Sequence, residues 1–171
     1  MKKLLLLVPV LLLAASLSFA ATSADTTLTV LVGAEAAISV DTTPAFTSAP
    51  PFGNFTGTTT FKYWIRTTPT TGTGVITLKV SSDFAPTGGP SVGSPLVPTD
   101  TLTYVSTVAS PGTAVNGTAA LTDTNVATFS AGASSGIGGN SGNSVAWTLV
   151  NDPAYPAKSY TATVTFTISA T

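Results

Sequence analysis

The chain of 171 residues has no cysteine and no histidine, and only 8% of its residues are charged. These absences remove the usual general base, the thiol nucleophile and the soft metal ligands. Because its few carboxylates form no recognisable pair, we expect that the protein is not an enzyme and needs no metal or cofactor. A glycosidase, in which folding brings two acids such as Asp83 and Asp123 together, is the enzymatic alternative.

Positive charge is also scarce. Residues 21–171 carry four Lys or Arg against seven Asp or Glu, a net charge of −3. A surface that binds phosphates needs clustered cations, so nucleic acid is excluded as a partner. Threonine occupies many of the polar positions instead. Its branched side chain suits a strand but leaves sheet edges without the charge that usually protects them from pairing.

Residues 1–20 have the pattern of a secretion signal. Lys2 and Lys3 precede an apolar run over 4–13, and Ser18, Phe19 and Ala20 form a small-x-small cleavage site. No apolar run of that length follows. The sequence therefore predicts a protein secreted to the cell surface or beyond, with no transmembrane segment after cleavage.

The rest of the chain indicates strands and turns. No window shows a sustained 3.6-residue period, whereas period-two alternation recurs. The predicted strands span 60–66, 75–81, 101–108, 119–121, 126–129, 145–150 and 160–169. This pattern predicts an all-β fold, an antiparallel immunoglobulin-like β-sandwich of about seven to nine strands, with a closed barrel as the alternative.

The connections between strands carry further expectations. The link over 68–74 (TPTTGTG) predicts a hairpin between the strands on either side of it. Residues 85–98, rich in Gly and Pro, and residues 131–144 (AGASSGIGGNSGNS) are predicted to be loops. Trp147 shares a face with Val145 and Leu149 and is predicted to lie in the core.

An alternating stretch follows the secretion signal directly. Every even position from 28 to 40 is apolar, namely Leu28, Val30, Val32, Ala34, Ala36, Ile38 and Val40. A strand of this length would span roughly 43 Å at about 3.3 Å per residue, about twice a typical strand. One small domain cannot bury all of it. We therefore expect residues 21–33 to be an extension that packs into another copy of the protein, and residues 34–171 to form the sandwich.

The closing segment alternates as regularly. Its apolar face consists of Tyr160, Ala162, Val164, Phe166 and Ile168. Its opposite face consists of Thr161, Thr163, Thr165, Thr167 and Ser169. Because this strand ends almost at the last residue, we expect it to be a structural part of the sheet.

The secretion signal and the two alternating ends resemble fimbrial (pilus) subunits of the spore coat U-like, archaic chaperone–usher kind. The resemblance implies an incomplete sandwich whose missing strand is supplied by the next subunit, called donor-strand complementation. Leu28, Val30 and Val32 would be the donor side chains, and Tyr160, Ala162, Val164, Phe166 and Ile168 would line the acceptor groove. It also implies a filament used in adhesion or biofilm, with a periplasmic chaperone and an outer-membrane usher as partners. Subunits of that family commonly carry a disulfide, which this chain lacks.

Other features favour a surface module that binds carbohydrate or cell wall. Trp64 lies on the polar face of its strand, where an exposed ring offers a stacking platform for a sugar. The triplet Trp147-Thr-Leu149 followed by the closing strand is similar to the WxL domain, which binds Gram-positive cell walls.

Two short polar patterns remain. Asp123 and Asn125 have the spacing of a calcium loop without its Gly and Glu. Asn54 and Asn116 match the glycosylation pattern but are predicted to be turn residues.

Overall fold

The computed structural model describes residues 26–171, and its compact domain comprises Val32–Thr171. The predicted secretion signal and residues 21–25 of the predicted extension lie outside the described residues. The strands are β1 (Glu35–Val40), β2 (Phe55–Arg66), β3 (Gly74–Ala85), β4 (Leu102–Thr107), β5 (Thr113–Ala114), β6 (Gly117–Thr118), β7 (Thr124–Phe129), β8 (Asn140–Leu149) and β9 (Thr161–Ala170).

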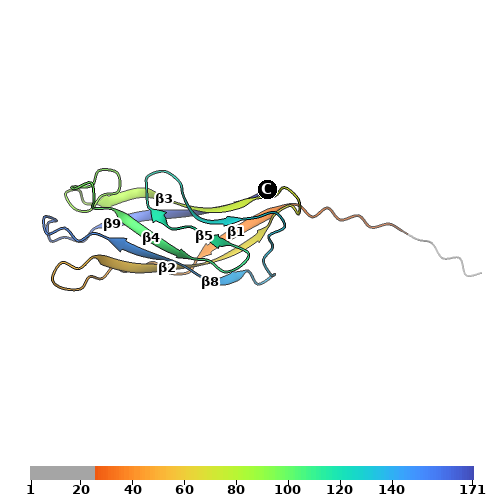
Figure 1. Ribbon diagram of the computed structural model, residues 1–171, viewed down its shortest axis with the longest axis horizontal. Coiled ribbons are helices and arrows are strands. Elements are labelled where there is room, and N and C mark those ends of the chain that lie inside the picture. Colours follow the sequence, from red (N-terminus) through yellow and green to blue (C-terminus); the bar gives the residue numbers. More distant parts are fainter. Residues whose placement is uncertain (1–25) are drawn as a thin grey trace, which may run out of the picture. The chain divides into compact units, whose positions relative to one another are not determined.

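The strands form two antiparallel sheets, visible as two layers in Figure 1. One sheet has the order β1-β2-β8-β4-β6 and the other has the order β5-β7-β3-β9. The prediction of an all-β sandwich is confirmed. The alternative of a closed barrel is wrong, because the strands divide between two separate sheets.

The core lies between the sheets and follows from the alternation of β2 and β3. Phe61, Tyr63 and Ile65 of β2 are buried, and so are Ile76 and Leu78 of β3. The predicted hairpin between these two strands is wrong. Each strand is central in its own sheet, where β2 pairs with β1 and β8, and β3 pairs with β7 and β9. The link between them crosses from one sheet to the other, so that their apolar faces meet across the core.

The prediction of a loop over 131–144 is wrong at its end, because β8 already begins at Asn140. The reason is the buried amide of Asn143, which is 1% exposed. Its Oδ1 accepts a hydrogen bond from the backbone N–H of Ala109 at 2.8 Å, and its Nδ2 donates to the carbonyls of Phe61 at 3.1 Å and Asn140 at 2.8 Å. These bonds lie where the register between β2 and β8 shifts. A polar side chain here satisfies backbone groups that the irregular ladder leaves without partners.

The strand predicted over 119–121 is also absent, although its backbone still bonds to both sheets. The N–H of Ala119 donates to Leu102 O at 2.8 Å, and Ala120 O accepts from the N–H of Val80 at 2.9 Å. The segment crosses between layers, and this crossing prevents it from continuing either ladder. Trp147 lies in the core as predicted, 3% exposed, and its Nε1 donates to Thr59 Oγ1 at 2.9 Å.

Replacing Asn143 by alanine tests the role of its amide. We expect Asn143→Ala to lower the free energy of unfolding by about 2–4 kcal/mol, because it leaves buried backbone groups unpaired. Denaturant unfolding measures this change. The matched control is Asn54→Ala at an exposed position, where we expect a change within about 0.5 kcal/mol. Equal stability of the two variants would contradict this role for Asn143.

Candidate functional site

The last strand, β9, lies at the edge of its sheet. Among residues 26–171 it pairs with β3 only, in a register that joins Ile76 to Ile168, Leu78 to Phe166 and Val80 to Val164. The N–H and C=O groups on its other edge therefore have no strand partner within the described part of the chain. Such an edge is a template for pairing with a further strand.

The inward side chains of β9 are only half-buried. Val164, Phe166 and Ile168 pack against the core, and the Phe166 ring lies 5.9 Å from that of Phe61 and 6.5 Å from that of Trp147. Each nevertheless keeps solvent exposure that the equivalent side chains of β2 and β3 do not have. The core is thus incompletely covered along β9.

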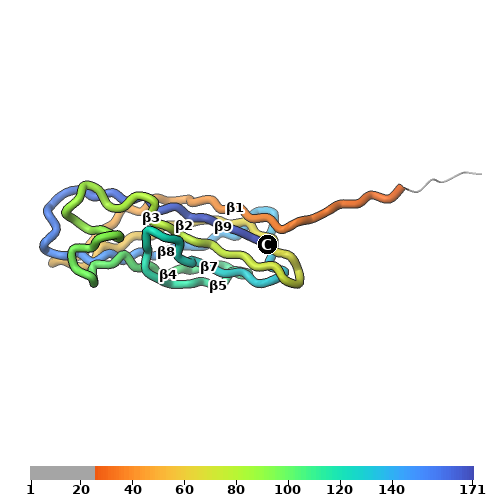
Figure 2. Tube along the Cα trace, turned by 90° about the horizontal axis from the view of Figure 1, so that it is seen from above, coloured from red at the N-terminus to blue at the C-terminus, as the bar shows by residue number. Residues whose placement is uncertain are grey.

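Strand β1 forms the edge of the other sheet on the same side of the domain. Figure 2 shows β1 and β9 running side by side, and Cα atoms of the two strands approach within 8 Å without backbone pairing between the strands. Ala36 and Ile38 of β1 are half-buried and also pack against the core. We call the partly buried apolar residues of these two edges the seam: Ala36, Ile38, Val164, Phe166, Ile168 and Ala170.

The structure places the predicted acceptor residues unequally. Ala162, Val164, Phe166 and Ile168 share the inward, half-buried face of β9. Tyr160 precedes the strand; its hydroxyl donates to Pro156 O at 2.8 Å and its ring packs against Gly89, which leaves no room there for a Cβ. Sequence reasoning missed the contributions of Ala36, Ile38 and Ala170. The alternation of β1 marked Ala36 and Ile38 as apolar, but nothing local indicated that they would lie beside β9.

The strand predicted over 28–40 forms only in its second half, although the alternation of apolar residues spans the whole segment. Only Glu35–Val40 pairs with β2, and residues 26–34 form no strand. The predicted donor side chains are exposed, Leu28 by 87%, Val30 by 80% and Val32 by 60%. Three large apolar side chains with this exposure on alternate positions are a feature typical of an interaction segment rather than of a solvated tail. We call residues 26–32 the extension.

Trp64 is held in place by its neighbours. Its Nε1 donates to Ile137 O at 3.1 Å, the Lys62 ammonium lies 5.1 Å from the ring centroid, and Gly139 packs against the ring. The ring is half-buried by the loop that follows β7. This arrangement fixes the loop on the sheet and reduces the ring surface that a sugar would stack on.

Asp83 organises a loop. Its carboxylate accepts hydrogen bonds from the backbone N–H groups of Phe84 and Val92 at 2.8 Å and Gly93 at 2.9 Å, and from the Ser91 hydroxyl at 2.7 Å. Partial burial acts to raise the pKa of Asp83, but these donors outweigh it and lower the pKa below its usual value. The carboxylate is thus committed to holding residues 84–93.

The other predicted polar sites have ordinary surroundings. Asp123 and Asn125 are exposed, and within residues 26–171 no three acidic side chains gather closely enough to hold a metal ion. Asn116 Oδ1 accepts from the N–H of Ser106 at 2.8 Å, as a turn residue does.

Asp100 is buried, and its Oδ2 accepts a 2.8 Å hydrogen bond from Tyr155. Burial and this bond raise the pKa of the Tyr155 hydroxyl far above its usual range.

The contribution of Asp83 to stability depends on pH. Because its pKa is lower in the folded chain, its carboxylate stabilises the fold above the ordinary carboxyl pKa, and this stabilisation is lost as pH falls through the folded value. We expect Asp83→Asn to lower the free energy of unfolding by about 1 kcal/mol at neutral pH, with the partial solvent exposure taken into account. The deficit should disappear in acid. Denaturant titrations at several pH values measure it, with the exposed Asp123→Asn as control; a deficit independent of pH would contradict the assignment.

Comparison with known proteins provides no relative. No protein-family model matches this sequence, and neither a curated protein nor a solved structure matches it. In the described part of the chain, no helix is long and apolar enough to cross a membrane. The seam and the extension are therefore the features from which a function has to be inferred.

Proposed function

We propose that this protein is the structural subunit of an extracellular filament, a pilus or fimbria that serves adhesion or biofilm formation. Residues 1–20 would direct its export and be removed. Each subunit would then lend its extension to the seam of the next copy, and the chain of such contacts would be the filament.

The observation that carries this proposal is the match between two incomplete parts of one chain. The extension has apolar side chains on alternate positions and no strand partner within the described residues. The seam has a free strand edge and a half-buried apolar face. A β-strand added along β9 would satisfy both, through backbone hydrogen bonds on one side and inserted side chains on the other.

The strand order supports an immunoglobulin-like sandwich that lacks its last strand. In that fold one sheet has the order A-B-E-D and the other contains C-F-G. Here β1-β2-β8-β4 corresponds to A-B-E-D, while the adjacent β3 and β9 correspond to C and F. Strand G would lie on the free edge of β9. The extension of a second copy is the segment that we propose takes this place.

The positions of the start of β1 and of the end of β9 support one direction for the donated strand. The start of β1 lies opposite Arg66 at the end of β2, and the N–H of Thr68 donates to O of Thr171, just past β9. The extension is therefore attached at the end of the domain where β9 finishes. When copies stack end to end, it enters the next copy where β9 starts, and it runs antiparallel to β9.

The energy of such a contact is sufficient for a polymer. Full burial of Leu28, Val30 and Val32 contributes roughly 5–8 kcal/mol before the cost of ordering the segment, at about 1.5–3 kcal/mol each. The donating and accepting surfaces are different, so the contact is head-to-tail and does not close on itself. Repetition produces a filament.

A subunit with an open seam needs protection until it assembles. Its surface has few charges, and the free edge of β9 presents threonines rather than lysines. Such an edge is prone to uncontrolled pairing. A periplasmic chaperone that covers the seam and an outer-membrane usher that releases it are the partners we propose for this stage.

The alternative function, a module that binds carbohydrate or cell wall, has less support. It relied on Trp64 as an exposed platform and on the WxL-like triplet that begins at Trp147. Lys62, Gly139 and the carbonyl of Ile137 contact the Trp64 ring, and Trp147 is buried in the core. Removal of residues 21–33 separates the two functions. A binding module would keep its ligand after this deletion, whereas the filament subunit would lose assembly and remain folded.

The polarity of the extension provides a direct test. We expect Val30→Asp to abolish filaments and leave soluble monomers, because a carboxylate cannot enter the apolar seam without a large desolvation cost. Thr29→Asp is the matched control, since it adds the same charge on the opposite face of the strand, toward solvent. Negative-stain microscopy and size-exclusion chromatography of the secreted protein measure assembly. Filaments of normal length from Val30→Asp, or equal loss in both variants, would overturn the proposal.

A free peptide should occupy the seam. We expect a peptide of residues 26–34 to bind the Val30→Asp monomer, whose seam is intact, with one peptide per chain. Binding should raise the melting temperature of that monomer as the peptide concentration rises, because the ligand stabilises only the folded state. The control peptide carries the Val30→Asp change and should leave the melting temperature unaltered. Equal effects of the two peptides would contradict insertion of the apolar side chains.

A further inference from the structure

Donation to a neighbour competes with closure of each subunit on itself. The extension is tethered to β1, which borders the seam of the same chain. A tethered segment acts at an effective concentration of order millimolar, well above that of a second copy in dilute solution. If donation to a neighbour is the function, as proposed above, the fold needs a feature that disfavours self-closure.

The tightest way to fold the extension back is a two-residue turn at Gly33 and Ala34, since glycine suits the first central position of a type II′ hairpin. This turn places Val32 opposite Glu35 and Val30 opposite Ala37. Residues directly opposite each other share a face of the sheet, and Glu35 and Ala37 lie on the exposed face of β1. The tight hairpin therefore turns the apolar side chains to solvent, and its formation buries no apolar surface.

A three-residue loop over 33–35 instead turns the donor side chains toward the seam. It places Val32 opposite Ala36 and Val30 opposite Ile38, whose side chains point into the seam. This loop is the shortest that turns all three donor side chains inward. It requires Glu35 to leave its place in β1 opposite Arg66, and Gly33 to become the first residue of a turn.

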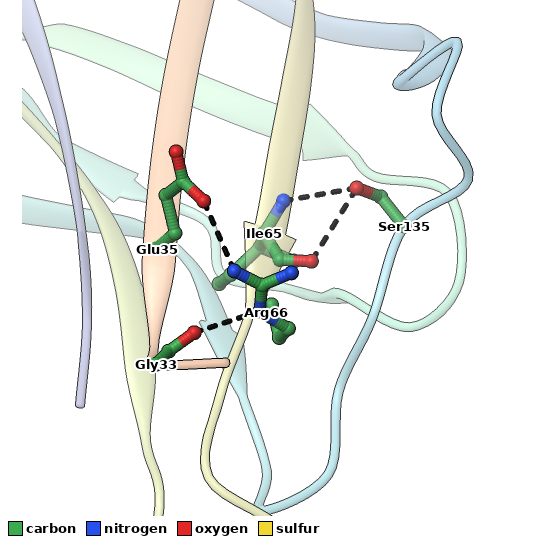
Figure 3. A network of polar contacts seen from close by, with 5 residues as sticks. All are labelled: Gly33, Glu35, Ile65, Arg66 and Ser135. Carbon is green, nitrogen blue, oxygen red and sulfur yellow. Dashed lines mark hydrogen bonds and ion pairs between the residues drawn. The ribbon is translucent and has the colours of Figure 1, made fainter. Parts of the chain in front are cut away.

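Arg66 holds these two residues. Figure 3 shows its guanidinium between them: Nε donates to Gly33 O at 2.7 Å, and Nη2 donates to Glu35 Oε2 at 3.0 Å. Glu35 and Arg66 are also direct partners in the register of β1 and β2. One side chain thus binds the first and the last residue of the loop that self-closure needs.

Arg66 is itself fixed on the side away from β1. Its backbone bridges to Ser134, and Ser135 N–H donates to Ile65 O at 2.9 Å. The neighbouring Ile65 N–H donates to Ser135 Oγ at 3.0 Å (Figure 3). The end of β2 is therefore held between β1 and the loop after β7. A rigid support of this kind lets the guanidinium control the direction in which residues 33–35 leave the domain.

We propose that Arg66 is a positioning residue that prevents self-closure and thereby directs the extension to a second copy of the chain. Its contacts are exposed, 45% for the Arg66 side chain and 78% for that of Glu35, so they contribute little to the stability of the domain. They act instead on the conformation of residues 33–35. This conformation decides whether the extension enters its own seam or the seam of a second copy.

The extension runs along β9 in opposite directions in the filament and in the self-closed subunit, so an experiment can distinguish the two arrangements. In the filament the extension runs antiparallel to β9, so Leu31 lies near Thr163 of another copy. In a self-closed subunit it runs antiparallel to β1 and parallel to β9, so Leu31 lies near Ser169 of its own chain. These two places on β9 are six residues apart, about 20 Å, well beyond the reach of a disulfide. All three positions face outward when the donor side chains face inward.

The absence of cysteine in the chain makes paired cysteines a clean probe. The pair Leu31→Cys with Thr163→Cys reports on the filament by an intermolecular ladder on non-reducing gels. The pair Leu31→Cys with Ser169→Cys reports on self-closure by an intramolecular disulfide. Each pair is made in the full chain with Arg66 retained, with Arg66→Gln, and with Lys158→Gln, which removes a cation from a distant loop as the matched control.

We expect Arg66→Gln to reduce the intermolecular ladder at least fivefold and to raise the intramolecular disulfide by a similar factor, without lowering the melting temperature. Glu35→Gln leaves the bond from Arg66 to Gly33 O in place. Its yields of both disulfides should lie between those of the parent chain and those of Arg66→Gln. Lys158→Gln should behave as the parent chain does. A purely structural role for Arg66 would lower the melting temperature without moving disulfides from between chains to within chains.

Two results would overturn the inference, and they differ. If the parent chain forms the ladder and Arg66→Gln forms it equally, Arg66 does not direct the extension, while the filament stands. If the parent chain forms no ladder and its intramolecular disulfide already dominates, the subunit closes on itself and the proposed filament fails as well.

Discussion

A strand edge without a partner, in front of a core that it covers only partly, is the constraint on which the rest of this structure depends. Strand β9 has the length and the alternation of an interior strand, yet among residues 26–171 it bonds to β3 alone. Exposed backbone groups and half-buried side chains such as Phe166 and Ile168 cost free energy that an added strand would recover. The proposed exchange of strands follows from this incompleteness.

The chain meets that constraint with unusually little charge. A conventional edge is protected by lysine, proline or a bulge, whereas the outward face of β9 consists of threonine and serine. Neutral hydroxyl side chains leave the edge open to a specific partner. In the proposed exchange of strands, specificity comes from the alternation of the donor side chains and from the geometry with which residues 33–35 leave the domain. Arg66 acts on this geometry.

The core and the edge strand were predictable because they depend on local patterns. Phe61, Tyr63, Ile65 and Trp147 alternate with polar residues, and a half-buried strand requires that period. The loop prediction over 131–144 was wrong from Asn140 onward for an equally physical reason. This segment has little apolar surface, but the Asn143 amide replaces apolar burial with hydrogen bonds to backbone groups that lie far away in the sequence.

The sequence by itself determined the class of fold, the face that each strand buries and the surplus of alternation ahead of Glu35, because all of these depend on side-chain period and turn chemistry. Only the tertiary structure decided which strands are neighbours. It separated β2 from β3, brought β1 beside β9 and placed Arg66 between Gly33 and Glu35. Strand pairing depends on how two sheets share one core, and no local pattern contains that information.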